Sequence, residues 1–193
     1  EKNLINQVYL RKHIGFKKVN ALRAEVYDKT SRDISYLDLK IEAIEDMELL
    51  DRSCILFLCV DDMETRRNIV KLAQFSYNLQ YIIEVRIGVN TGSIYSFNPH
   101  DLLEVEDWNN SSDYNNSDIE VTGVCGGSIP AINTVMLAST LAVNQGVVAY
   151  TAIKIKDDEL LESNFKMISF SSCPISMIAS RKSDITNRTQ IIS

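Results

Sequence analysis

The sequence predicts an α/β protein whose mostly parallel sheet carries an antiparallel edge hairpin, with a long apolar helix in the carboxyl-terminal half. Residues 54–60 form a continuous apolar run, which is typical of a strand buried on both faces of a parallel sheet. Residues 81–87 and 93–97 are strand-like and flank the turn-like segment 88–92, which predicts a hairpin. Helical and strand patterns alternate before this hairpin, as they do in α/β folds.

The first 50 residues are expected to hold two helices and one strand. Residues 1–14 are polar and irregular, and a helical stretch begins at Gly15. Its apolar residues recur on one face, namely Val19, Leu22 and Val26. Apolar and polar residues alternate over 37–41, which predicts a strand. A short helical piece over 46–50 then leads into the apolar run.

Two carboxylates, Asp61 and Asp62, follow the apolar run directly and precede a helical segment that extends to Tyr77. Ligands of parallel sheets bind at the carboxyl ends of the strands, so both carboxylates are candidates for a binding site. Aspartate is also favoured at helix amino termini, where it caps the helix and complements its dipole. From this stretch alone, capping is the favoured interpretation.

Residues 100–124 are rich in Asn, Ser and Asp, which predicts a mobile loop, and loops of this length are either functional or disordered. The helix expected over 130–150 is the most apolar of the chain; Pro130 suits its first turn and Ser128 is a candidate cap. Its length approaches that of a membrane span, but three polar residues argue against one: Asn133, Asn144 and Gln145.

Four alanines fall nearly on one face of this helix: Ala131, Ala138, Ala142 and Ala149. Small side chains let another element pack closely, so the helix is a buried core helix, part of a subunit interface, or both. A charged strand or loop is expected over 153–158, a strand over 165–170, and a polar tail over 174–193.

Composition narrows the function classes. A chain of 193 residues with 45% hydrophobic and 24% charged residues is typical of one soluble globular domain. The net charge of −6 argues against nucleic-acid binding, which needs a basic surface. The four cysteines form no CxxC pair, which removes the usual zinc-ribbon and redox motifs and favours a cytoplasmic setting. The chain opens with polar residues, so no signal peptide is expected.

Three motifs follow one another along the chain. The first comprises Asn3, Leu4, Gln7, Ile14, Gly15, Lys18 and Val19. The second comprises Asp61, Thr65 and Arg66, and the third comprises Cys125, Gly126, Gly127, Pro130 and the long helix. In this order they resemble the NLxxQ…IGxxKV, D-D/N…T-R and crossover segments of the ThiF/MoeB-type adenylating enzymes. That superfamily includes the ubiquitin-activating enzymes, and the resemblance covers residues 3 to 150.

The resemblance implies one Rossmann-like adenylation domain over residues 1–193 that binds ATP and Mg²⁺. Members of the family adenylate the carboxyl-terminal glycine of a ubiquitin-like or sulfur-carrier protein, and a thiol, sulfide or amine then attacks the acyl adenylate. The family also implies a homodimer or pairing with a related subunit.

The resemblance assigns roles to individual residues. Lys18 matches the lysine that stabilises negative charge developing on the α-phosphate and on pyrophosphate. Asp61 matches the carboxylate that holds Mg²⁺, a cation that prefers oxygen ligands, and Asp62 lies beside it. The remaining matches lie near the nucleotide and are Asn3, Asn6, Gln7, Arg11 and Arg66.

The chain departs from the family's pattern in three ways. The Gly-rich phosphate loop and the acidic residue that ends the second strand are absent; both are expected before Glu1, so the expectation is either that Glu1 is not the natural start or that a partner supplies the missing half. Asn6 stands where the family often has arginine, so Arg11 becomes the candidate for that phosphate contact. The paired CxxC zinc motifs of many members are absent as well.

These departures leave two other functions open. A non-catalytic subunit that pairs with an active adenylating partner would explain Asn6 and the missing glycine loop, although Lys18, Asp61 and Arg66 argue against it. A dinucleotide-dependent oxidoreductase on the same sheet is disfavoured, because the GxGxxG fingerprint and a convincing catalytic His or Tyr constellation are absent.

Cys125 is a candidate thioester-forming residue. It follows a long polar loop and precedes two glycines and a helix start, and a helix amino terminus lowers the pKa of a thiol. A structural cysteine at a tight turn is the alternative. Cys54 and Cys59, inside the apolar run, are expected to be unreactive.

Overall fold

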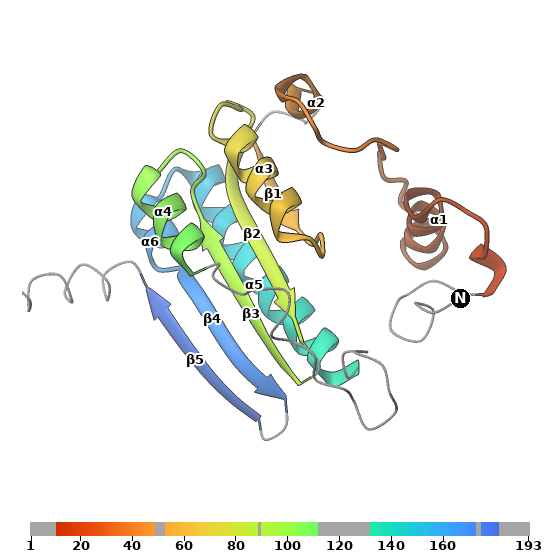
Figure 1. Ribbon diagram of the computed structural model, residues 1–193. Helices are drawn as coiled ribbons and strands as arrows, with labels where there is room; N and C mark the ends of the chain where they lie inside the picture. The colour runs from red at the N-terminus through yellow and green to blue at the C-terminus, as the bar shows by residue number, and fades with distance from the viewer. Residues whose placement is uncertain (1–10, 49–52, 89, 112–131, 173–174, 182–193) are drawn as a thin grey trace, which may run out of the picture. The chain divides into compact units, whose positions relative to one another are not determined.

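The computed structural model describes residues 11–48, 53–88, 90–111, 132–172 and 175–181 and is shown in Figure 1. The chain divides into two compact units, Glu1–Ile41 and Glu42–Ser193. The first carries the helical motif with Lys18, and the second carries the sheet with Asp61.

The amino-terminal unit is built around one helix. The 3₁₀ helix η2 (Arg11–His13) precedes α1 (Lys18–Thr30), and α1 ends where Ser31 adopts a left-handed conformation with φ of 55°. Arg23 of α1 forms an ion pair with Asp33 in the segment that follows. Residues 32–41 form no strand, so the strand expected over 37–41 is wrong for the structure. Alternation alone does not make a strand, because a strand needs a neighbour to accept its hydrogen bonds.

The carboxyl-terminal unit contains a five-stranded sheet with strand order β1-β2-β3-β4-β5. Its strands are β1 (Cys54–Leu58), β2 (Leu79–Ile87), β3 (Thr91–Phe97), β4 (Phe165–Ser172) and β5 (Ile175–Arg181). Its helices are α2 (Ile44–Glu48), α3 (Met63–Ala73), α4 (Leu102–Asn110), α5 (Ile132–Ile155) and α6 (Asp158–Glu162). The α/β class, the antiparallel hairpin and the long apolar helix are therefore confirmed.

The pairing changes once across the sheet, from parallel to antiparallel. β1 pairs with β2 in parallel, through the crossover helix α3. The pairs β2–β3, β3–β4 and β4–β5 are antiparallel. The antiparallel edge thus extends beyond the expected hairpin. It includes β5, which lies in the segment expected to be a polar tail.

Two segments that were expected not to be helical are helical in the structure. Helix α4 lies within the expected 100–124 loop, where the Asp101 side chain accepts hydrogen bonds from the backbone N–H groups of Leu103 and Glu104. Its Trp108 is buried and stacks on Phe97 of β3 with ring centroids 5.4 Å apart. The cap and this aromatic contact give α4 a starting point and a core contact. Helix α5 likewise continues to Ile155, into the segment expected to be a strand or loop.

Helix α5 packs along one face of the sheet, while α3 and α4 lie on the other (Figure 1). Its buried alanines contact a core that includes Ile83 of β2 and Ile94 of β3; those alanines are Ala138, Ala142 and Ala149. The expected core helix is confirmed. The described alanines face the sheet, so they are not available to a subunit interface. Ala131 lies outside the described residues.

The opposite face of α5 is apolar and exposed. Its side chains recur at helical spacing along the whole helix: Ile132, Met136, Val143, Val147 and Tyr150. By length and composition alone α5 could also cross a membrane, and 33% of its most apolar window is buried in the structure. The outward apolar residues form what we call the α5 outer stripe.

Candidate functional site

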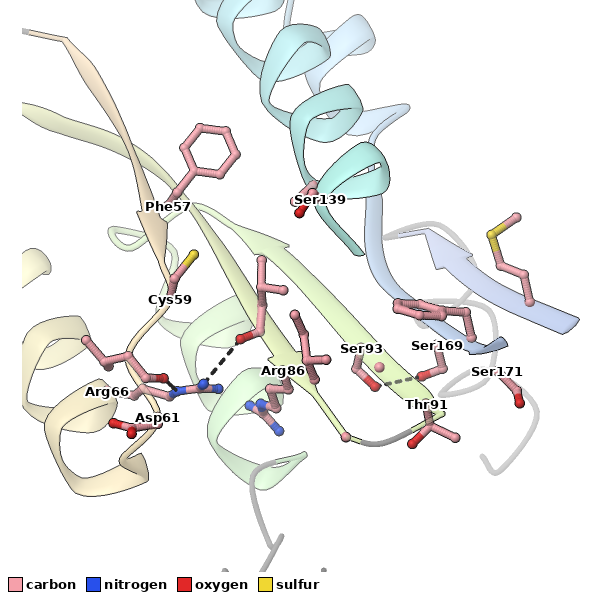
Figure 2. A pocket seen from close by; sticks show the side chains of 18 of the residues that line it. Phe57, Cys59, Asp61, Arg66, Arg86, Thr91, Ser93, Ser139, Ser169 and Ser171 are labelled. Atoms are coloured by element: carbon pink, nitrogen blue, oxygen red, sulfur yellow. Dashed lines mark hydrogen bonds between the residues drawn. The ribbon is translucent and has the colours of Figure 1, made fainter. Parts of the chain in front are cut away.

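A pocket of about 740 Å³ opens beside the carboxyl ends of β1 and β2. One wall is the end of β1 and the turn after it, and another is α5. The remaining lining comes from β2, β3, β4 and β5, with a hydroxyl-rich group consisting of Thr91, Ser93, Ser169, Ser171 and Ser176. Figure 2 shows Cys59 and Asp61 on the β1 side, Ser139 on α5, and the Ser93–Ser169 hydrogen bond on the strands.

The two aspartates after β1 have different surroundings. Asp62 is the N-cap of α3, and its carboxylate accepts a hydrogen bond from the Thr65 backbone N–H at 2.6 Å. Hydrogen bonds from Thr65 hold the pKa of Asp62 below its usual value. Asp61 lines the pocket, is exposed, and makes no hydrogen bond or ion pair with the residues that the structure describes. Capping therefore belongs to Asp62, and Asp61 is available to a ligand.

The donor set around Asp61 fits a weakly held, ligand-dependent cation. No group of three or more His, Cys, Asp or Glu side chains gathers anywhere in the described ranges. Mg²⁺ usually keeps several waters and binds through one or two carboxylates plus substrate phosphates, not through a complete protein cage. One exposed carboxylate beside a pocket of about 740 Å³ is consistent with that mode.

Arg66 lines the pocket, but its guanidinium is bound by the protein. Its Nε donates to the Val60 carbonyl at 2.6 Å, Nη2 donates to the Val85 carbonyl at 3.2 Å, and Nη1 pairs with Glu84. Arg66 is the arginine of the T-R motif, and α3 places it over the sheet. The geometry supports a role in holding the turn between β1 and α3.

Glu84 is a functional candidate that the sequence analysis missed. It is fully buried in β2 and accepts from Arg66, from Arg86 Nε at 2.8 and 2.9 Å, and from Trp108 Nε1 at 3.0 Å. The available signal was a glutamate inside the apolar run 81–87, because a charged residue in a buried strand needs a partner. Arg86, two positions later, was the nearest candidate partner.

Cys59 was expected inside the strand, but it lies just after the end of β1, so that prediction is wrong. Cys54 does lie in the strand and is half-buried. The Cys59 side chain lines the pocket (Figure 2). Desolvation raises the pKa of its thiol, and the nearby Arg66 only partly offsets that shift. A raised pKa leaves less thiolate at neutral pH. Low reactivity therefore remains the prediction for Cys59.

The other sequence-predicted site residues are distributed over the chain. Lys18 is the first residue of α1 and Arg11 the first of η2, and both are exposed in the amino-terminal unit. Asp61, Asp62 and Arg66 lie together in the carboxyl-terminal unit. Four further candidates lie outside the described residues: Asn3, Asn6, Gln7 and Cys125.

The fold is shared with solved structures. E. coli MccB with ATP matches with a TM-score of 0.62 and 15% identity, over 94% of this chain and 52% of that one. E. coli MccB with AMPCPP and MccA matches with a TM-score of 0.61 and 15% identity, over 94% of this chain and 52% of that one. Selenomethionine PaaA matches with a TM-score of 0.59 and 14% identity, over 93% of this chain and 60% of that one. This chain thus spans about half to three fifths of their length. No family profile and no curated protein matches the sequence.

Proposed function

We propose that this chain provides the catalytic part of an ATP-dependent adenylating enzyme that activates the carboxyl terminus of a ubiquitin-like or sulfur-carrier protein. The observation that carries the proposal is Asp61, an exposed carboxylate without a partner in the described residues, which lines a pocket beside the end of a parallel strand. The ordered ThiF/MoeB-like motifs support it. A fold similar to that of MccB, which has been solved with ATP and with MccA, supports it as well.

The proposed chemistry is a nucleophilic displacement at the α-phosphorus of ATP. A carboxylate oxygen of the substrate attacks the α-phosphorus of ATP, and the bond to the bridging oxygen of pyrophosphate breaks. Negative charge grows on the α-phosphate and the leaving group, where a bound Mg²⁺ and a lysine would stabilise it. In this chain Asp61 would hold the cation and Lys18 would supply the lysine. The acyl adenylate is then attacked by a thiol, sulfide or amine, and Cys125 is the candidate thiol.

The pairing of subunits belongs to the same proposal. The side chains of the α5 outer stripe are exposed, and one of them, Val143, also lines the pocket. Soluble proteins usually cover apolar surfaces of that kind with a partner. We assign the stripe to contact with a second copy of the chain or with a related subunit. The described small-residue face is already used in the core, so the large apolar side chains make this contact.

ATP–pyrophosphate exchange tests the proposal. In the complete protein, Asp61→Ala and Lys18→Ala should each reduce exchange at least about 100-fold, because each removes charge stabilisation in the transition state. The matched controls are the exposed α3 residues Glu64 and Lys71, whose variants Glu64→Gln and Lys71→Ala should keep wild-type exchange. Circular dichroism should show all four variants folded.

Three outcomes would contradict the assignments. Near wild-type exchange in Asp61→Ala or Lys18→Ala would remove that residue from the site. A folded wild-type protein that binds neither ATP nor substrate would favour the non-catalytic subunit, and selective binding of NAD would favour the oxidoreductase. A nucleotide-binding panel distinguishes these functions before any mutant is made.

A further inference from the structure

A buried charge network lies directly beneath the candidate site. At its centre is Glu84, whose carboxylate is fully buried and accepts hydrogen bonds from Arg66, Arg86 and Trp108. Arg66 and Arg86 both line the pocket, and their side chains are only 8% and 12% exposed. Two cations are thus held around one buried anion near the carboxyl ends of β1 and β2.

The network connects three separate elements of the carboxyl-terminal unit. Arg66 belongs to α3, Glu84 and Arg86 to β2, and Trp108 to α4. Arg86 Nη1 also donates to the Ser111 carbonyl just after α4, at 3.2 Å. Its guanidinium lies over the Tyr95 ring with its carbon 4.2 Å from the ring centroid. The network therefore fixes the relative positions of a helix, a strand and a second helix.

One bond of the network reaches the turn that carries Asp61. Arg66 Nε donates to the carbonyl of Val60 at 2.6 Å, and Val60 immediately precedes Asp61. Nη2 of the same guanidinium donates to the Val85 carbonyl at 3.2 Å. One planar group thus links the turn after β1 to the end of β2, while Glu84 holds that group in place.

Stability alone does not account for such a network. Replacing a buried ion pair by apolar residues of similar volume is often neutral or stabilising, so a buried pair is weak evidence for a purely structural role. Buried hydrogen bonds commonly serve to orient a side chain that binds a metal ion. The link through Val60 gives this network that geometry.

We propose that Glu84 is a positioning residue: through Arg66 and the Val60 carbonyl it fixes the turn that presents Asp61 to the bound cation. That Asp61 binds a cation rests on the proposed function. That Glu84 fixes the turn does not, because it is a property of the protein alone.

Two variants test the proposal. Glu84→Gln removes the charge that holds both arginines. Arg66→Lys keeps a cation beside Glu84, but a single ammonium cannot reproduce the planar fork that reaches Glu84, Val60 and Val85. The matched control is Glu64→Gln, the same chemical change at an exposed position on α3. Trp108 is the only tryptophan of the chain, so its emission spectrum reports whether the network has changed.

Hydrogen–deuterium exchange of the peptide that spans residues 59–63 is the first readout and needs no nucleotide. Both variants should exchange faster there than wild type and Glu64→Gln, with exchange in β3 and β4 unchanged. The second readout is the Mg²⁺ concentration for half-maximal ATP–pyrophosphate exchange. It should rise about 10- to 100-fold in both variants, as is typical when a supporting group behind a metal ligand is lost. In Glu84→Gln, whose altered side chain does not line the pocket, the rate at saturating Mg²⁺ should be largely retained.

Each remaining outcome has a defined meaning. The proposal would be overturned if a folded variant with altered Trp108 emission showed unchanged hydrogen–deuterium exchange at residues 59–63. It would also be overturned if hydrogen–deuterium exchange increased equally across the whole sheet. If both variants fail to fold, the network serves the fold as a whole and the positioning role is wrong. If the wild-type protein shows no ATP–pyrophosphate exchange but hydrogen–deuterium exchange at residues 59–63 rises in both variants, the proposed function fails while the positioning of Asp61 stands.

Discussion

Neighbouring residues of one type take different roles in the turn after β1, and backbone geometry separates them. Asp62 occupies the N-cap position with extended backbone (φ −96°, ψ 126°), so its carboxylate turns back to the N–H of Thr65. Asp61, one residue earlier, lines the pocket and has no partner among the described residues. From the sequence the two were equivalent. The start of α3 distinguishes them, because only the residue at the cap position can reach the first free N–H groups of the helix.

The Asp62 cap makes a pH-dependent contribution to stability. The pKa of Asp62 is lowered in the folded state from an ordinary value of 3.8, chiefly by hydrogen bonds from Thr65. A lowered folded pKa means that the contribution is complete well above pH 3.8 and is lost as the pH falls through the folded pKa. Asp62→Ala should lower Tm at pH 7 by roughly 2–4 °C. Asp62→Asn should retain most of the cap but lose the acid dependence. Equal Tm values for wild type and Asp62→Ala at pH 7 would refute the assignment.

At the scale of elements, close packing decides which small residues matter. Glycine is disfavoured in strands, yet Gly92 occupies β3 because the Phe170 ring of β4 lies over it. A Cβ at this position would lie 2.5 Å from Phe170 Cζ and 2.9 Å from the Arg86 carbonyl oxygen. Gly146 of α5 is similarly crowded, because a Cβ there would lie 2.5 Å from Cζ of Phe57 in β1. Both glycines bring elements closer than an alanine would allow.

Gly92→Ala should therefore destabilise the protein by about 1–3 kcal/mol, the usual cost of overpacking a filled core. Phe170 is buried, and the Arg86 carbonyl oxygen belongs to the backbone, so neither can move away freely. Chemical denaturation followed by circular dichroism measures the effect. Thr91→Ala, an exposed position on the same strand, should change the free energy of unfolding by no more than about 0.5 kcal/mol. A Gly92→Ala protein as stable as Thr91→Ala would show that the strand pair can relax.

At the scale of the whole chain, local patterns predicted the elements, but not the contacts between them. The continuous apolar run of β1, the turn between the two strand-like segments of the hairpin and the long apolar stretch of α5 are each visible in the local sequence, and all three elements are confirmed. Helix α4 was missed because its burial depends on Trp108 meeting Phe97 and Glu84, and β5 was missed because its serines resembled a polar tail. The Glu84 network joins residues 18 and 24 positions apart. No local pattern encodes such pairs, so this part of the candidate site required the structure.

The whole-molecule prediction concerns association through the α5 outer stripe. Side chains at 132, 136, 143, 147 and 150 lie on one face at helical spacing and are each more than half exposed, whereas the alanines behind them fill the core. We expect a dimer in solution, measured by light scattering across a concentration series.

Val147→Glu should raise the dimer dissociation constant at least about 100-fold, because burying an unpaired charge costs several kcal/mol. Val147 does not line the pocket, so ATP binding should persist. Asn144→Glu, an exposed position at the side of the stripe, is the control and should remain dimeric. A wild-type protein that is monomeric at high micromolar concentration, or a Val147→Glu variant as dimeric as the control, would rule out association through this face.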